Sequence, residues 1–182
     1  MNKLIPIILL VLMTFVAYGV YKQANKSMKT KRLECQSKTT TFEKIFVEEP
    51  IKEAINSLKS NNYTINSSIE YSKFMKSNLI NILTKEQADE ILNKVIKSQI
   101  NIENEKTSDD TKVSINYYIY ENDKQDTGKK NNDAKSYAGY LMFEFKYNNI
   151  LVYKIQTDYM DINASDLEDR MQCAIKSFID ID

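Results

Sequence analysis

The chain has few residues suited to acid–base or nucleophilic catalysis. Its 182 residues include no histidine, which removes the commonest general base and every Ser-His or Cys-His pair. Carboxylates are numerous, but they fall on predicted helix surfaces, in polar loops or beside lysines, where solvation or capping explains them. We therefore expect a protein that is not an enzyme and that uses no cofactor.

The two cysteines, Cys35 and Cys173, lie near opposite ends of the part of the chain that follows the apolar start. They have no Cys-x-x-Cys spacing and no histidine beside them, which excludes a zinc site. At 100° per residue, Cys173 lies about 140° from the centre of the apolar stripe of its predicted helix, away from the core. A peripheral segment that carries Cys35 could reach it there. We expect a disulfide, with two unrelated reduced thiols as the alternative.

The segment from Asp161 to Ser165 allows two chemical interpretations. It resembles the start of a calcium-binding loop, but Asp166 stands where glycine is needed and Gln172 where a bidentate glutamate belongs, so we expect no metal. The same residues form an Asn-x-Ser sequon with an acid two positions before the asparagine, the extended form that bacterial N-glycosylation uses. Asn163 is therefore a candidate glycosylation site, and a turn before a helix is the alternative explanation.

The balance of charge argues against nucleic acid as a partner. Lysine plus arginine and aspartate plus glutamate are equal, at 25 each, so the chain has no basic footprint. Tyrosine, which is common at protein interfaces, is concentrated in the predicted strands. Tyr118, Tyr120 and Tyr140 are predicted on the solvent side of the sheet. They are candidate protein-binding residues, with packing at the sheet surface as the alternative.

The apolar start of the chain predicts contact with a membrane. Residues 4–20 read LIPIILLVLMTFVAYGV, with no charge, and a helix of that length spans about 26 Å, the short limit for a bilayer core. Residues 1–21 are either a retained signal anchor or a signal peptide cleaved near Ala17-Tyr18-Gly19. Residues 22–38 are basic and read as a linker or stalk.

Two features of the sequence predict opposite orientations for such a membrane segment. Only Lys3 precedes the segment, whereas Lys22, Lys26, Lys29, Lys31 and Arg32 follow it, and this charge asymmetry favours a body in the cytoplasm. An apolar amino terminus before a single soluble body, together with paired cysteines, favours export. We expect a single-pass inner-membrane protein whose body faces the periplasm. The alternatives are a periplasmic protein after cleavage and a body that faces the cytoplasm.

The part of the chain after the linker contains several stretches that predict helices. Residues 39–182 are enough for one domain. Residues 39–47 combine β-branched residues with helical spacing and stay unassigned. Thr84 with Gln87, and Ser165 with Glu168, have the spacing of capping boxes. Apolar residues at helical spacing predict about four helices, which begin near Pro50, Tyr71, Thr84 and Ser165.

Strict alternation of apolar and polar residues predicts strands at residues 112–121, 136–146 and 150–159. A three-residue loop before Ile150 would pair Phe145 with Leu151 and keep the large apolar residues on one side. The predicted fold is therefore α+β: one three-stranded antiparallel meander packed on one face by about four helices, after an N-terminal membrane or signal helix.

These features together favour a non-enzymatic bacterial envelope protein, membrane-tethered or exported, that binds another envelope protein. The alternative is an inhibitor or immunity protein against a secreted toxin or a lysozyme-like enzyme, which would also need a rigid surface and no active site. An envelope hydrolase that uses carboxylates is the third class.

Overall fold

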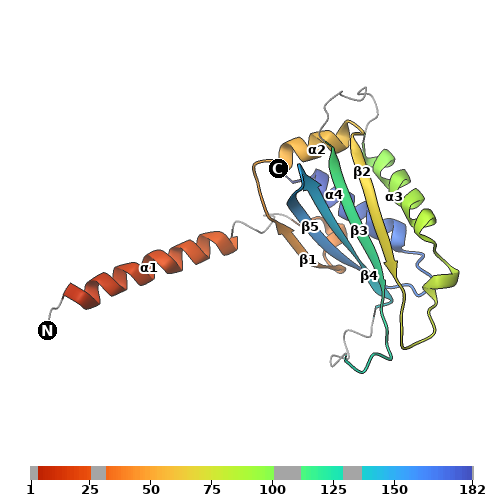
Figure 1. The fold of residues 1–182 in the computed structure, drawn as a ribbon, viewed down its shortest axis with the longest axis horizontal. Helices are drawn as coiled ribbons and strands as arrows, with labels where there is room; N and C mark the ends of the chain where they lie inside the picture. The colour runs from red at the N-terminus through yellow and green to blue at the C-terminus, as the bar shows by residue number, and fades with distance from the viewer. Residues whose placement is uncertain (1–3, 26–31, 101–111, 129–136, 182) are drawn as a thin grey trace.

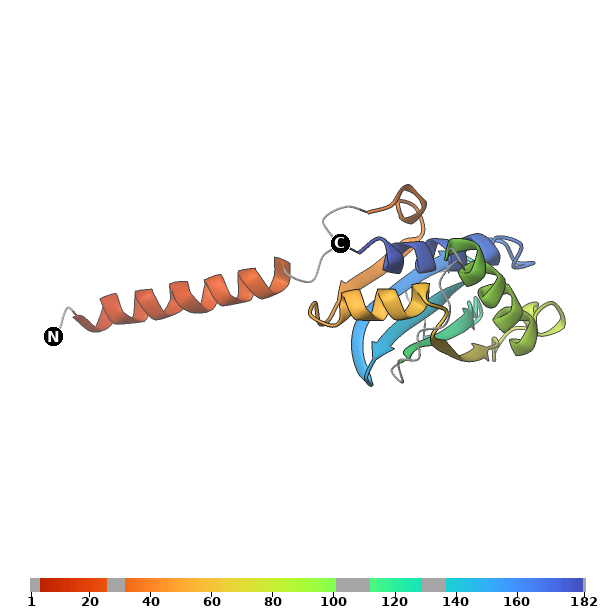
Figure 2. The same ribbon diagram turned by 90° about the horizontal axis from the view of Figure 1, so that it is seen from above.

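The computed structural model describes residues 4–25, 32–100, 112–128 and 137–181. The described residues of the body form a five-stranded mixed sheet with helices on one face, so the fold is α+β, as expected. Figures 1 and 2 show that helices α2 (Ile51–Lys59), α3 (Lys85–Gln99) and α4 (Leu167–Ile179) all lie on the same side of the sheet. The core lies between these two layers.

The strands are arranged in the order β1-β5-β4-β3-β2. Strands β2 and β3 are parallel and joined through α3, while every other neighbouring pair is antiparallel. The bounds are β1 Thr40–Ile45, β2 Tyr63–Glu70, β3 Val113–Glu121, β4 Gly139–Tyr147 and β5 Ile150–Tyr159. Helix α1 covers Leu4–Asn25, and two short 3-10 helices are η1 (Glu34–Gln36) and η2 (Leu79–Asn81).

The prediction of a three-stranded sheet is wrong, because two further strands flank the expected ones. Strand β1 pairs with β5 and comes from the segment that the sequence left unassigned. Strand β2 begins just after Asn61, whose φ of 57° helps the chain to leave α2. Its sequence, YTINSSIE, has few large apolar residues, so alternation alone did not reveal it.

The segment from Tyr71 to Leu83 is not the predicted helix. It is an irregular loop that ends in η2, and we call it the β2–α3 loop. Carboxylates of Glu121 and Asp123 accept hydrogen bonds from amides of this loop. Backbone donors that bind distant carboxylates do not need a helix to satisfy them. Among the described residues, three helices rather than about four therefore cover the sheet.

The β4–β5 hairpin turns through two residues, so the predicted three-residue loop is wrong. Asn148 and Asn149 have φ of 50° and 62°, as a type I′ turn requires. An extra residue in β5 then shifts the register, so that Phe145 lies opposite Tyr153 instead of Leu151. This bulge returns the large apolar residues to the core side. Alternation thus identified the correct face but not the register.

One predicted capping box is confirmed and the other is wrong. At the start of α3, the Gln87 amide donates to the Thr84 hydroxyl at 3.2 Å, and the Thr84 amide donates to the Gln87 side chain at 2.8 Å. Helix α4 instead follows Asp166. The hydroxyl of Ser165 donates to Asp161 in the preceding turn, and so does not cap the helix.

The predicted disulfide is confirmed, since Cys35 and Cys173 are bonded, with their Cα atoms 5.9 Å apart. Cys173 lies outside the main apolar cluster, although it is only 3% exposed. The bond joins the part of the chain that precedes β1 to the middle of α4.

Within the part of the chain that the structure describes, we find no helix with both the length and the apolar character needed to cross a bilayer. The predicted membrane helix over residues 4–20 is therefore not matched, and the membrane contact stays a prediction. Helix α1 extends to Asn25, beyond the predicted end of the apolar segment.

Candidate protein-binding surface

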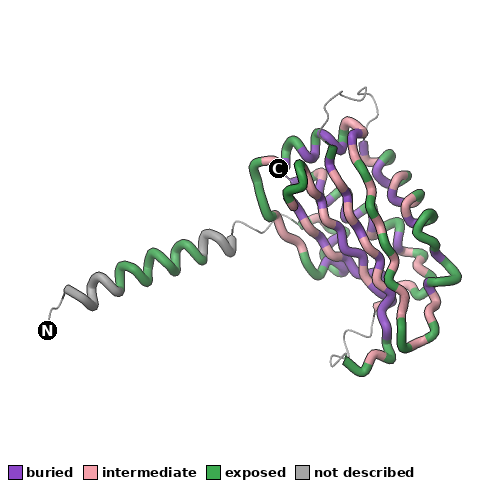
Figure 3. Tube along the Cα trace, viewed as in Figure 1, coloured by how far each residue is buried: buried purple, intermediate pink, exposed green. Residues whose placement is uncertain are grey.

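One face of the sheet carries no helix among the described residues (Figure 2). Figure 3 views the sheet from this side and shows buried and half-buried positions alternating along the central strands. Because side chains alternate along a strand, the even-numbered residues of β3 and β4 point to this side and the odd-numbered ones to the core. We call this side the outer face.

The three tyrosines predicted to bind a protein are in contact on the outer face. Tyr120 and Tyr140 lie opposite each other on β3 and β4, and their rings stack with centroids 4.9 Å apart. Tyr118 meets Tyr140 edge to face at 6.0 Å. We call these three residues the tyrosine cluster. All three are half-buried, and their binding of a protein stays a prediction.

Close approach of the backbones at Gly139 positions the cluster. A Cβ at Gly139 would lie 2.0 Å from the carbonyl oxygen of Tyr120 and 2.5 Å from the ring of Tyr159. Only glycine fits without displacing one of these groups. Gly139 directly precedes Tyr140 and pairs with Glu121, so this residue sets how near β4 comes to β3 at the cluster.

The register of the sheet places acids beside the tyrosines. Glu70 lies opposite Tyr120, and Asp158 lies opposite Tyr140. One row across the sheet therefore reads Glu70, Tyr120, Tyr140, Asp158. Glu70 is exposed, whereas Asp158 is 5% exposed and burial raises the pKa of its carboxyl.

The surroundings of the cluster are negative. Burial raises the pKa of the Tyr120 hydroxyl, and the charges of Asp126, Asp123 and Glu70 raise it further. Burial also raises the pKa of Tyr140, with smaller contributions from its tyrosine neighbours and from Glu70. The hydroxyls therefore stay protonated at neutral pH and act as hydrogen-bond groups.

The row of the outer face next to the acidic one runs from Tyr118 through Met142 and Gln156 to Phe42. Met142 is 8% exposed and Phe42 is 38% exposed. In the following row, the Glu144 carboxylate binds the ammonium groups of Lys154 at 2.8 Å and Lys146 at 3.6 Å. The hydrogen bond from Lys154 is the main reason that the pKa of Glu144 is lowered. The Glu144 carboxylate is thus paired with cations of the same chain.

A buried carboxylate that we did not single out from the sequence lies at the end of β3. Glu121 is 3% exposed. One oxygen accepts from the amides of Asn78 and Leu79, and the other from Ser72 and Ser77. Burial alone would raise the pKa of Glu121, but these hydrogen bonds outweigh it and lower the pKa. The sequence did contain a sign of this buried acid, because Glu121 falls on the core-facing side of the apolar–polar alternation in β3.

Asp123 holds the tip of the β2–α3 loop in the same way. Its carboxylate accepts from the amides of Lys73 and Phe74 at 2.7 and 2.6 Å. The Phe74 side chain itself is 63% exposed, and Ile80 and Ile82 are also exposed. The two buried acids therefore fix the shape of the loop, and we assign them a structural role.

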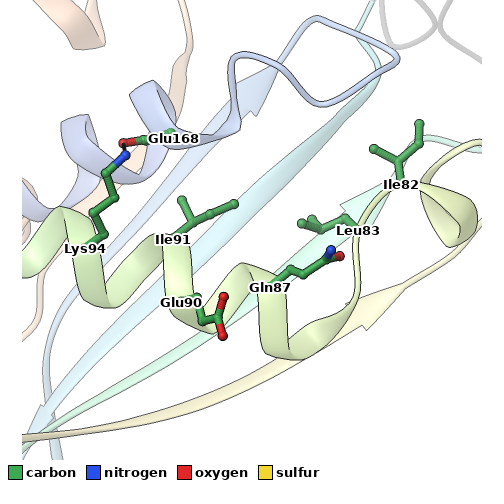
Figure 4. A pocket seen from close by; sticks show the side chains of 7 residues that line it. All are labelled: Ile82, Leu83, Gln87, Glu90, Ile91, Lys94 and Glu168. Carbon is green, nitrogen blue, oxygen red and sulfur yellow. Dashed lines mark hydrogen bonds and ion pairs between the residues drawn. The ribbon is translucent and has the colours of Figure 1, made fainter.

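A cleft of about 400 Å³ lies between α3 and the start of α4 (Figure 4). Its polar groups do not converge on a common point, and Lys94 and Glu168 pair with each other at 2.9 Å. No set of metal-binding side chains occurs in the described ranges. The cleft is lined by Ile82, Leu83, Gln87, Glu90, Ile91, Lys94 and Glu168.

Asn163 lies in the turn between β5 and α4 and is exposed. The backbone N–H of Asn163 donates to the carboxylate of Asp161 at 2.8 Å. Ala164, the next residue, has a φ of 57°. Surface exposure is necessary for glycosylation, and the modification of Asn163 stays a prediction.

No protein-family model matches the chain, no curated protein matches its sequence and no solved structure matches it. Function is therefore inferred from the geometry of the outer face and from the chemistry of the chain's own residues.

Proposed function

We propose that this chain is a non-enzymatic envelope protein, exported or tethered to the membrane, whose domain binds another envelope protein through the outer face. The tyrosine cluster carries the proposal, because Tyr118, Tyr120 and Tyr140 are in contact on a sheet face that no described helix covers. Tyrosine combines a large apolar ring with a polar tip, which suits a surface that is wet when free and buried when bound.

The disulfide supports export. A bond between Cys35 and Cys173 is stable in the periplasm or outside the cell, whereas cytosolic thiols are kept reduced. The apolar start of the chain also supports export or tethering. In α1 every residue from 10 to 20 is exposed, and a continuous apolar surface of this kind is unfavourable in water. We infer a single-pass protein with a periplasmic body, or a periplasmic protein after cleavage.

Rigidity supports a binding role. The tyrosine cluster lies on the two central strands β3 and β4, and the Tyr140 backbone is held close to β3 at Gly139. A surface that is already ordered before binding loses less conformational entropy when a partner docks. The same property would suit an inhibitor of a secreted enzyme, so the experiment must identify the partner.

The proposal is tested by site-specific photocrosslinking in the native host. Benzoylphenylalanine at position 118 of the full chain is expected to crosslink to a resident envelope protein, identified by mass spectrometry. Glu53 is exposed on α2, on the opposite side of the sheet, and the same probe at position 53 is the matched control. A secreted toxin or lytic enzyme as the adduct supports the inhibitor alternative. Absence of an adduct specific to position 118, or a cytoplasmic adduct, contradicts the proposal.

A further inference from the structure

We propose that the partner presents a cationic side chain, arginine or lysine, to the tyrosine cluster beside Glu70. This inference rests on the proposed function, and adds to it the chemical class of the surface that docks. Two features carry it: three tyrosines in contact that are only half-buried, and the nearby carboxylates of Glu70 and Asp126, which form no ion pair with a cation among the described residues.

The aromatic part of the site is the stack of Tyr120 on Tyr140 with Tyr118 at its edge. Ring faces carry a negative quadrupole and attract cations placed within about 6 Å of the ring centre. All three residues are half-buried rather than buried, so part of each side chain or backbone is accessible to solvent. Neutral apolar partners would also fit such a surface, so the choice depends on the charges around it.

The acidic part of the site lies one strand away. Glu70 is directly opposite Tyr120 in the β2–β3 ladder, and neighbouring strands are about 4.8 Å apart. A single guanidinium or ammonium group can therefore contact the ring and the carboxylate together. Asp126, in the turn after β3, adds a second negative charge that acts on Tyr120.

The acids near the cluster differ from Glu144, an acid on the outer face that does form ion pairs. Glu144 lies two rows away on the same outer face and binds both Lys154 and Lys146. Neither Glu70 nor Asp126 forms an ion pair with any cation in the described residues. Among the described residues, the outer face therefore pairs the carboxylate at one end with lysines and leaves Glu70 and Asp126 near the tyrosines without an ion pair. A cation from a partner would pair with these two carboxylates.

A short peptide can test the inference without knowledge of the partner. The probe is acetyl-Gly-Arg-Gly-Arg-Gly-amide, titrated into the full chain with ¹³C-labelled tyrosine rings in detergent micelles and followed by NMR. Peptides with glutamine or glutamate in place of arginine are the charge controls. Ring signals of the tyrosine cluster are expected to shift with the arginine peptide alone, and the shifts should decrease as salt is added.

Variants separate the ring contribution from the carboxylate contribution. Glu70→Gln is expected to weaken binding of the arginine peptide about two- to fivefold, as is Tyr120→Leu, while Tyr120→Phe keeps the ring and should retain most of the affinity. Glu86→Gln, at an exposed position at the start of α3, is the matched control and should have no effect. Unfolding curves of the four variants check that each is folded.

The outcomes distinguish this inference from the proposed function. Equal shifts with the neutral or acidic peptide, an unchanged affinity of Glu70→Gln, or no ring shift at the highest soluble peptide concentration would overturn the inference. A partner that crosslinks at position 118 would still support protein binding in those cases. Selective arginine binding without any crosslinked envelope partner would support the cation site and count against the proposed function.

Discussion

Replacement of Glu121 by glutamine is expected to loosen the β2–α3 loop. The carboxylate accepts five hydrogen bonds, at distances between 2.5 and 3.1 Å. A glutamine side chain has almost the same shape, but one oxygen becomes an NH₂ group that can only donate. If that group takes the position near Asn78 and Leu79, it faces two backbone amides. If it takes the other position, it faces the Ser72 amide, and the hydroxyl of Ser77 must rotate.

The size of the effect follows from these contacts. Hydrogen bonds to a charged group contribute about 1.5–3 kcal/mol each, and a buried donor left without a partner costs a similar amount. Either placement of the amide disrupts at least one backbone bond to Glu121, at a residue that is only 3% exposed. We expect the free energy of unfolding to fall by about 2–4 kcal/mol, because the loop can relax in part.

Urea unfolding of the full chain, followed by far-UV circular dichroism, measures this change. Glu144→Gln is the matched control, because its side chain is 27% exposed and it pairs with surface lysines. Such pairs contribute about 0–1 kcal/mol. A loss of less than about 1 kcal/mol in Glu121→Gln, or a loss no larger than that of the control, would refute the structural role of Glu121.

The pH dependence gives a second measurement of the same residue. The pKa of Glu121 is lowered in the folded state from its ordinary value of 4.5. A carboxyl with a lowered folded pKa contributes stability above the unfolded pKa, and this stability is lost as pH falls through the folded pKa. The difference between the parent chain and Glu121→Gln should therefore shrink progressively below about pH 4.5. A constant difference down to pH 2 would show that hydrogen bonds to the ionised form are not its cause.

Three further changes have expected outcomes. Joint replacement of Cys35 and Cys173 by serine removes a link across 138 positions, and should lower the free energy of unfolding in urea by at most about 5 kcal/mol, with addition of reductant to the parent as its check. Gly139→Ala should cost about 1–3 kcal/mol and alter the near-UV circular dichroism of the tyrosines, because the added methyl group meets backbone. Tyr153→Phe removes the 2.5 Å hydrogen bond to Glu43, whose side chain is 4% exposed; a loss of about 1–3 kcal/mol in thermal unfolding is expected, and no loss would contradict it.

The sequence by itself determined the features that depend on one element at a time. Alternation in residues 113–121 and in β4 identified which side chains face the core, because successive residues of a strand point to opposite faces. The capping pair at Thr84 followed from spacing along one helix turn. The position of Cys173 on its helix, away from the apolar stripe, supported the prediction of its bond to Cys35, with two reduced thiols as the alternative.

Only the tertiary structure decided how these elements meet. The register between β4 and β5 depended on a bulge in β5. The shape of the β2–α3 loop depended on buried acids more than 40 positions away. The contact within the tyrosine cluster depended on the close approach of the backbones at Gly139. The periodicity of apolar residues indicates which face of a strand or helix is buried, because this depends only on residues that are close in the sequence. It does not record which distant backbone donor a carboxylate will bind, or which strand will lie beside another, because those choices depend on packing of the whole chain.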